Sequence, residues 1–266
     1  MTQVVELCRW STTVGGGGKI GMSGRSLACA VVLACASAVV SLPVSAEPRA
    51  VLELFTSQGC SSCPAADKLL GEFAADPTLL AMSLAIDYWD YLGWKDTLAL
   101  AGHSRRQRAY AKSRNDRDIF TPQMVVNGTA HVLGSDKAAI ERAIAQTRGT
   151  ATLSLPVTLA VTDGKLGVNV PEGAGERAEV WLCPITKAVS VAIGRGENHG
   201  RTITYHNVVR RWLKLGEWTG KGQSWKIPFA DIAGKDKVID TAAVVVQRGV
   251  AASPGLMLGA AMVALK

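Results

Sequence analysis

The chain has 266 residues, of which 48% are hydrophobic and 19% are charged, and this balance excludes a disordered or fibrous protein. Its formal net charge of +7 comes without a long block of lysine and arginine or a basic surface interleaved with aromatic residues, so we expect no nucleic-acid partner. The length favours one large or two modest domains, and the composition changes near Gly149. We therefore expect two domains after an N-terminal leader.

The leader is expected to occupy residues 1–46, as an N-terminal extension and a signal peptide. An apolar run over residues 27–40 follows Arg25 and leads into small residues that end at Ala46, which is typical of a secretory signal with its cleavage site. The run is too short to favour a membrane anchor, so we expect no stable membrane span after signal cleavage. A lipoprotein signal at Cys35 is the minor alternative. The mature protein is expected to be periplasmic or secreted.

The predicted elements of the first half alternate between strand and helix. Their order is a strand (50–55), a helix that opens at Cys60, a strand (79–86), an aromatic loop (87–96), a helix (97–114), a hairpin around Asn127-Gly128 and a helix that Ser135 caps. This is the order of a thioredoxin-like fold, with helices on both faces of a sheet, and we place such a domain at residues 47–149. The basic face of the 97–114 helix is interpreted as a solvated surface, and it comprises Arg105, Arg106, Arg108, Lys112 and Arg114.

The second half contains only short β-like runs, separated by turn signals such as Asp163-Gly164 and His199-Gly200. We expect residues 150–266 to form a mainly antiparallel, sandwich-like β domain that packs on the first domain. The predicted fold class is therefore α/β, with a thioredoxin-like domain followed by a β domain.

Three cysteines follow the leader, namely Cys60, Cys63 and Cys183. Exported proteins keep disulfides, but closing the short Cys60-Ser-Ser-Cys63 loop removes little chain entropy, so chemistry explains the pair better than stability does. A cysteine at a helix N-terminus is acidified by unpaired N–H groups and the helix dipole, which favours a Cys60 thiolate that attacks disulfides. Cys63 is expected to resolve the mixed disulfide. Cys183 is interpreted as an inert buried thiol.

Two further positions are candidates for this chemistry. Thr121-Pro122 enters the predicted hairpin where a thioredoxin fold places a cis-proline loop, and its backbone is expected to pair with an extended substrate. An ordinary proline at the start of an edge strand is the alternative. Glu53 lies on the first strand, close to where thioredoxins keep a buried acid that takes the proton of the resolving thiol. A glutamate that faces the surface is equally compatible with this position.

The loop over residues 87–96 is too aromatic for an ordinary connection. We interpret Trp89, Tyr91 and Trp94 as substrate-binding residues that wall the active site, and packing between the two domains is the equal alternative. The charged turn over residues 195–201 is interpreted as a plain hairpin tip rather than an anion site. The histidines are scattered and give no second close-spaced ligand pair, so we expect no metal site and no cofactor.

Four stretches of the sequence, at residues 53–64, 87–96, 121–128 and 195–210, together resemble one known family. It is a bacterial secreted, thioredoxin-like family catalogued as domain of unknown function 1223, and the resemblance covers essentially all of the chain after the leader. The resemblance implies a thioredoxin-like fold, a signal peptide and a periplasmic setting, and it implies no established substrate.

These observations together predict an exported thiol-disulfide oxidoreductase that uses the Cys60 and Cys63 couple. Its partners are expected to be protein or small-molecule thiols and disulfides. Cys60 would attack, Cys63 would resolve, Pro122 would shape the substrate groove, and Glu53 would relay a proton. The first alternative is a non-catalytic periplasmic binding module with a structural disulfide, and the second is a copper(I) chaperone that uses the same two thiolates.

Overall fold

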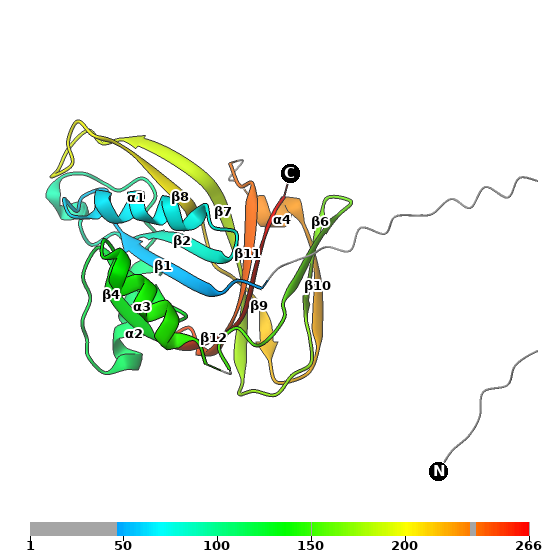
Figure 1. Ribbon diagram of the computed structural model, residues 1–266. Coiled ribbons are helices and arrows are strands. Elements are labelled where there is room, and N and C mark those ends of the chain that lie inside the picture. Colours follow the sequence, from blue (N-terminus) through cyan, green and yellow to red (C-terminus); the bar gives the residue numbers. More distant parts are fainter. Residues whose placement is uncertain (1–46, 150, 235–237, 266) are drawn as a thin grey trace, which may run out of the picture. The chain divides into compact units, whose positions relative to one another are not determined.

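The apolar run that begins at Ala50 forms the strand β1 (Ala50–Thr56), in which all seven residues are buried. In the computed structural model, β1 pairs in parallel with β2 (Leu79–Ala85) and antiparallel with β3 (Gln123–Val126) (Figure 1). The strand β4 (Ala130–Leu133) pairs with β3 and completes this edge of the sheet. The structure describes residues 47–149, 151–234 and 238–265, so the predicted leader lies outside the described residues.

Helices cover both faces of this part of the sheet. On β1, Leu52 and Leu54 pack with apolar residues of α1 (Cys63–Ala74) and α3 (Lys137–Thr147), whereas the alternate residues pack toward Tyr110 of α2 (Ala101–Arg114). Because successive side chains of a strand point to opposite faces, α2 lies on the other side of the sheet from α1 and α3. The short helices η1 (Asp90–Leu92) and α4 (Phe229–Ala233) lie in connections.

Helix boundaries differ from the expectations in three places. The helix α1 begins at Cys63 rather than Cys60, because the preceding residues form a turn in which the Cys63 N–H donates to the Cys60 carbonyl oxygen. The helix α2 begins at Ala101 rather than at residue 97. Asp136, not Ser135, caps α3, since its carboxylate accepts an N–H of the first helical turn.

The second half of the chain extends the same sheet. The strand β7 (Ala178–Ala192) is one continuous strand where the sequence predicted two, and β11 (Thr241–Val250) pairs with its first part. On its other edge, β7 pairs first with β9 (Leu213–Trp218) and then with β8 (Thr202–Val209). The edge strand β12 (Ser253–Ala264) pairs with β11. The sequence did not predict β9 or β12.

The two halves join where β2 and β8 run in parallel, with Ser83 opposite Val208. The strand order is β12-β11-β7-β8-β2-β1-β3-β4, with β9 off this path on β7, so the sheet is continuous across the predicted boundary at 149/150. All described residues belong to one compact unit. The fold is therefore α/β with a large mixed sheet, and a division into two folding domains stays a prediction.

A second, three-stranded sheet faces part of the first. It consists of β5 (Thr158–Thr162), β6 (Lys165–Val170) and β10 (Gln223–Pro228), all antiparallel. Apolar side chains of β5 and β6 share one buried cluster with those of β7, β11 and β12. Asp163 and Gly164 both have positive φ, so the β5–β6 hairpin turns where the sequence predicted. Among the described residues, no helix has the length and apolar character needed to cross a membrane.

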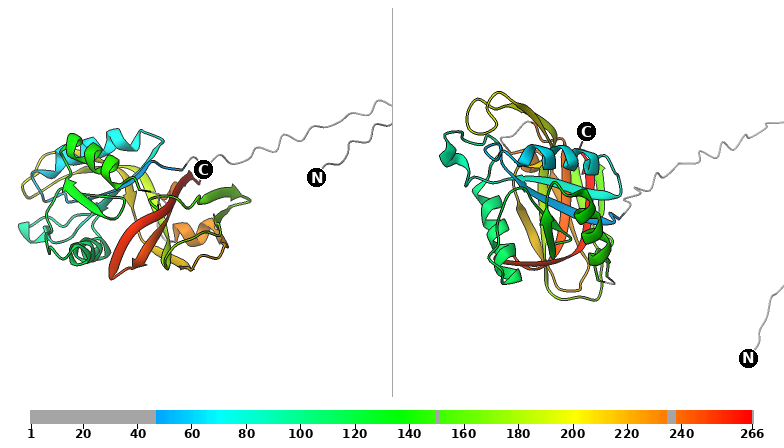
Figure 2. Two further views of the ribbon diagram at one scale, coloured as in Figure 1. Left: turned by 60° about the horizontal axis from the view of Figure 1, so that its bottom comes forward. Right: turned by 60° about the vertical axis from the view of Figure 1, so that its left-hand side comes forward.

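The β7–β8 hairpin extends beyond the rest of the sheet and positions the site. Figure 1 shows it passing along α1, and Figure 2 shows the same course from two further directions. Its tip contacts the turn that precedes α1, through side chains described below. Residues more than 130 positions apart in the sequence therefore meet at the N-terminal end of α1.

Candidate functional site

The two predicted cysteines lie together in the turn between β1 and α1. Cys60 and Cys63 form a disulfide, and their Cα atoms are 5.4 Å apart. Cys63 is fully buried and Cys60 is 2% exposed, whereas Ser61 and Ser62 between them are exposed. The Ser62 hydroxyl lies 3.4 Å from the Cys60 Sγ. The disulfide is therefore largely covered but is flanked by accessible residues.

The aromatic loop holds this turn through Gln58, a residue that the sequence analysis did not single out. The Trp94 indole N–H donates to Gln58 Oε1 at 2.8 Å, and the Gln58 side-chain amide donates to the Thr97 hydroxyl at 3.1 Å. The Gln58 backbone N–H donates to the buried Asp96 carboxylate at 2.8 Å. Burial raises the pKa of Asp96, although the backbone N–H groups that it accepts lower it. Trp94 thus belongs to the wall of the cysteine turn.

Trp89 connects the same loop to the predicted proline loop. Its indole N–H donates to the Thr121 hydroxyl at 2.8 Å, and the Thr121-Pro122 peptide bond is cis. The Ser62 hydroxyl donates to the Thr121 carbonyl oxygen at 3.4 Å. Tyr91 stacks on Trp89, with ring centroids 6.1 Å apart, and is 76% exposed. The structure therefore brings the Thr121-Pro122 loop and Trp89 to the cysteine turn, with Tyr91 at the outer margin.

The tip of the β7–β8 hairpin completes the site, although the sequence analysis interpreted it as a plain turn. Asn198 is fully buried, and its amide group donates to the carbonyl oxygens of Gln58 at 2.9 Å and of Cys60 at 2.8 Å. The neighbouring Glu197 accepts the Ser61 backbone N–H at 2.9 Å. No short sequence pattern predicts that an asparagine in a glycine-rich turn will be buried. The only signal in the sequence was that Asn198 lies in one of the four stretches that resemble the family.

Glu53 does not lie with the cysteines. It is fully buried on the α2 face of β1, whereas Cys63 belongs to α1 on the opposite face. Its carboxylate accepts hydrogen bonds from the Arg106 guanidinium at 2.7 Å and from the Tyr110 hydroxyl at 2.5 Å. Arg106 also donates to Gln247 on β11 at 2.8 Å. The structure therefore assigns Glu53 to a buried network that ties β1 to α2 and β11, and it contradicts the alternative of an exposed glutamate.

A different buried acid, Asp67, lies on the same helix as Cys63. The two residues are four positions apart on α1 and are both buried, so they occupy one helix face with Cβ atoms about 5 to 6 Å apart. Within the described residues, neither carboxyl oxygen of Asp67 has a hydrogen-bond partner. Burial raises the pKa of Asp67 to about 8, a nearby Thr56 hydroxyl lowers it, and the Asp96 charge raises it further. No motif pointed to Asp67 in the sequence.

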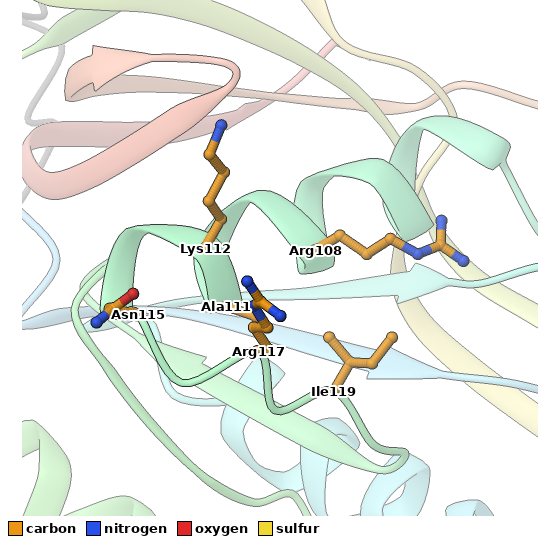
Figure 3. Close-up of a pocket in the computed structure, with 6 residues that line it drawn as sticks. All are labelled: Arg108, Ala111, Lys112, Asn115, Arg117 and Ile119. Atoms are coloured by element: carbon orange, nitrogen blue, oxygen red, sulfur yellow. The ribbon is translucent and has the colours of Figure 1, made fainter.

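The basic face of α2 is less uniform than predicted, because Arg106 is buried in the network with Glu53. Exposed side chains of this helix line a pocket of about 520 Å³ together with Arg117 (Figure 3). Figure 3 shows the charged ends of Arg108, Lys112 and Arg117 pointing in different directions rather than toward one point. The arrangement favours a solvated face over an anion site.

The remaining cysteine and the scattered histidines lie apart from one another in the described part of the chain. Cys183 is a fully buried free thiol, and burial raises its pKa. Within the parts of the chain that the structure describes, no group of three or more histidine, cysteine, aspartate or glutamate side chains lies close enough to hold a metal ion.

The fold and the site define a class: an α/β protein with a mixed sheet and a disulfide in the turn before its first helix, enclosed by an aromatic loop and a hairpin tip. The chain belongs to the family described as "Protein of unknown function (DUF1223)", whose model matches residues 51–247. The resemblance seen in the sequence is thereby confirmed.

Two solved structures are similar to this chain. The crystal structure of protein AGR_C_4864 from Agrobacterium tumefaciens is 29% identical, with a TM-score of 0.74 over 83% of this chain and 96% of the other. HBP35 of Porphyromonas gingivalis is 14% identical, with a TM-score of 0.57 over 82% of this chain and 76% of the other, and this likeness concerns the fold alone. A comparison with curated proteins gave no match.

Proposed function

We propose that this protein is a thiol-disulfide oxidoreductase of the periplasm or the extracellular space, in which Cys60 and Cys63 form a reversible couple. The observation that carries the proposal is the Cys60–Cys63 disulfide in the turn immediately before α1, beside the Thr121-Pro122 loop. The strand order β2-β1-β3-β4, with α1 and α3 on one face and α2 on the other, supports the thioredoxin-like assignment of the first half.

The proposed exchange consists of two displacements. In the first, the Cys60 thiolate attacks a substrate disulfide, a bond forms between Cys60 and one substrate sulfur, and the other sulfur leaves with its electron pair and takes a proton. In the second, Cys63 gives up its proton and attacks the Cys60 sulfur, which forms the internal disulfide and releases the second substrate thiol. The substrate gains two electrons, which the two cysteines supply, and two protons, of which one comes from Cys63 and one from the solvent that took the Cys60 proton.

Asp67, in place of Glu53, is the group proposed to exchange a proton with Cys63, which it accepts in its ionised form and returns in its neutral form. It shares a buried helix face with Cys63, and its pKa of about 8 matches the task of exchanging a proton with a thiol near neutral pH. Glu53 is already engaged with Arg106 and Tyr110 on the other face of the sheet. Asp67 therefore has the location and the protonation behaviour that the role requires.

The proposed substrate contacts lie around the Thr121-Pro122 loop. Thr121 receives hydrogen bonds from Trp89 and Ser62, which orients this loop next to the cysteine turn. Trp89, bonded to Thr121, and Trp94, bonded to Gln58, supply flat apolar surfaces next to the turn, and the exposed Tyr91 ring stacks on Trp89. A peptide or small molecule that carries a thiol or disulfide is the kind of substrate that suits such walls.

One observation favours the alternative of a binding module with a structural disulfide. Cys60 is only 2% exposed, and the Asn198 amide donates a hydrogen bond to its carbonyl oxygen. The hairpin tip therefore covers the cysteine turn and restricts its movement. A static disulfide in this setting would resist exchange with external thiols. The two functions are therefore separated by whether Cys60 forms mixed disulfides while the protein stays folded.

Trapping mixed disulfides tests the proposal directly. In the Cys63→Ser variant the resolving thiol is missing, so Cys60 is expected to accumulate a covalent adduct with a disulfide such as oxidised glutathione, detected by mass spectrometry. The Cys60→Ser variant is expected to form at least tenfold less adduct, because Cys63 lies on the buried face of α1, whereas Cys60 lies in the turn next to the exposed Ser61. Cys183→Ser in the Cys63→Ser background is the matched control and should leave the adduct unchanged. Absence of an adduct on Cys60 would favour the binding module.

A further inference from the structure

Glu197 is an exposed glutamate in the hairpin tip, and the neighbouring Asn198 holds this tip next to the cysteine turn. Asn198 is fully buried and donates two hydrogen bonds to the turn, so the backbone of the hairpin tip is fixed next to Cys60. From this anchor, the Glu197 carboxylate accepts the Ser61 backbone N–H at 2.9 Å. Hydrogen bonds from Ser61, by its hydroxyl and its backbone N–H, lower the pKa of Glu197. The carboxylate is therefore a fixed negative charge at neutral pH.

The Ser61 N–H belongs to the peptide unit that starts at Cys60. By covalent geometry, the carboxylate oxygen that accepts this N–H lies within roughly 8 Å of the Cys60 sulfur. The Ser62 hydroxyl donates to the Thr121 carbonyl oxygen while the disulfide is closed, but it lies 3.4 Å from the Cys60 Sγ and can turn its proton toward a thiolate there. The turn thus carries one group that opposes negative charge on Cys60 and one that supports it.

Two other charged groups near the tip, Arg201 and Asp96, make hydrogen bonds of their own, and Arg195 and His199 of the tip are exposed. The Arg201 guanidinium donates to the Asn198 side-chain oxygen at 3.2 Å, and the Asp96 carboxylate accepts the N–H groups of Gln58 and Leu98. No hydrogen bond or ion pair is seen between Glu197 and a basic side chain within residues 47–149, 151–234 and 238–265. The carboxylate is held by Ser61 alone among these contacts.

We propose that Glu197 is a positioning residue that makes the Cys60–Cys63 disulfide harder to reduce, by opposing the negative charge that Cys60 acquires when the disulfide opens. The inference rests on the proposed function and deepens it, because it names the group that regulates this couple. Ser62 acts in the opposite sense, through its hydroxyl next to the same sulfur.

The charge appears in a defined step of the reduction by glutathione. A glutathione thiolate attacks the Cys60 sulfur, the internal disulfide breaks, and Cys63 leaves with the electron pair and takes a proton. A second glutathione thiolate then attacks the glutathione sulfur of the mixed disulfide, oxidised glutathione forms, and Cys60 leaves as a thiolate. Two electrons pass from two glutathione molecules to the protein, and the new negative charge lies next to Glu197.

The expected size of the effect follows from the exposure of Glu197. Two unit charges within roughly 8 Å of each other interact weakly in water and more strongly where the buried Cys60 sulfur is shielded from water, and salt reduces the interaction further. We therefore expect the Glu197→Gln variant to be reduced more readily, with the equilibrium constant for reduction by glutathione raised about three- to tenfold. A tenfold change corresponds to about 30 mV.

The experiment compares equilibrium constants with glutathione at pH 7 for four proteins: wild type, Glu197→Gln, Ser62→Ala and Glu172→Gln. Glu172 is an exposed glutamate after β6, so its variant makes the same change of charge away from the cysteine turn and should match the wild type. Ser62→Ala removes the supporting hydroxyl and is expected to lower the constant. The Cys60 thiol pKa, measured from alkylation rates in the Cys63→Ser background, is expected to fall in Glu197→Gln.

The outcomes separate this inference from the proposed function. If the wild-type disulfide does not exchange with glutathione in the folded protein, the proposed function itself fails. If the wild type exchanges but Glu197→Gln gives the same constant and the same thiol pKa within twofold, the role of Glu197 is refuted and the function stands. A Glu197→Asp variant that behaves like Glu197→Gln would also refute it, because aspartate keeps the charge.

Discussion

The Asp67→Asn variant is expected to be more stable than the wild type at pH 7 and nearly equal to it at pH 4. Burial raises the pKa of Asp67 from 3.8 to about 8. Below the unfolded pKa the carboxyl group is protonated in both states, and its contribution to stability is fully present. As pH rises from there toward the folded pKa, the unfolded chain ionises and the folded protein does not, so the free energy of unfolding falls. Over about three pH units the loss amounts to roughly 4 kcal/mol, which the asparagine avoids because it does not ionise.

Urea unfolding of both proteins between pH 4 and pH 8 measures this difference. His103 is also fully buried, and burial lowers its pKa from 6.5 to about 4. The free energy of unfolding therefore also falls as pH drops below 6.5, but this effect is the same in both proteins. Asp76→Asn is the control, because Asp76 is an aspartate whose pKa is lowered by hydrogen bonds from Thr78. A gap between Asp67→Asn and wild type that is constant across this pH range would contradict the buried, neutral carboxyl group.

Replacing Glu53 with alanine is expected to destabilise the protein by about 3 to 5 kcal/mol, the usual cost of breaking a buried ion pair. The guanidinium of Arg106 loses its partner at 2.7 Å and stays largely buried beneath the Trp212 ring, whose centroid lies 4.1 Å from it. Because this network joins β1, α2 and β11, the loss weakens contacts between the first and second halves of the chain. Denaturant unfolding at pH 7 measures the cost.

The double variant Glu53→Leu with Arg106→Met is the matched control. It removes both charges together and fills similar volume, so it should recover most of the stability that Glu53→Ala loses. The folded variants should also retain adduct formation at Cys60, because Glu53 lies on the opposite face of the sheet. A cost below 1 kcal/mol for Glu53→Ala, or a loss of adduct with the fold intact, would overturn this view of Glu53.

Local features of the fold were predictable from the sequence. The apolar run that became β1 and the glycine turn at Asp163-Gly164 depend on short-range patterns, and both are found where expected. Strands that form only because a neighbouring strand pairs with them could not be predicted from the sequence. The strand β12 is rich in alanine and glycine, which have little preference for strands, and it is ordered by its pairing with β11.

The residues of the site also fall into those that short-range patterns reveal and those that distant contacts position. The Cys60-Ser-Ser-Cys63 spacing, the Thr121-Pro122 pair and the aromatic loop were identified in the sequence, and the structure brings them together. Asn198 reaches Cys60 only because β7 continues as one strand that carries its hairpin past α1. The orientation of Glu53 depends on Arg106, which lies 53 positions further along the chain. Such contacts depend on tertiary packing, so short-range patterns do not reveal them.

The equilibrium between the Cys60–Cys63 couple and glutathione shows whether the disulfide is reversible in the folded protein. The folded protein is incubated in mixtures of reduced and oxidised glutathione at pH 7, and its free thiols are counted by alkylation and mass spectrometry. We expect a reversible two-electron transition with the same midpoint from the oxidised and the reduced side, and with Cys183 unchanged throughout. A disulfide that stays oxidised in every mixture and opens only when the protein is unfolded would contradict it.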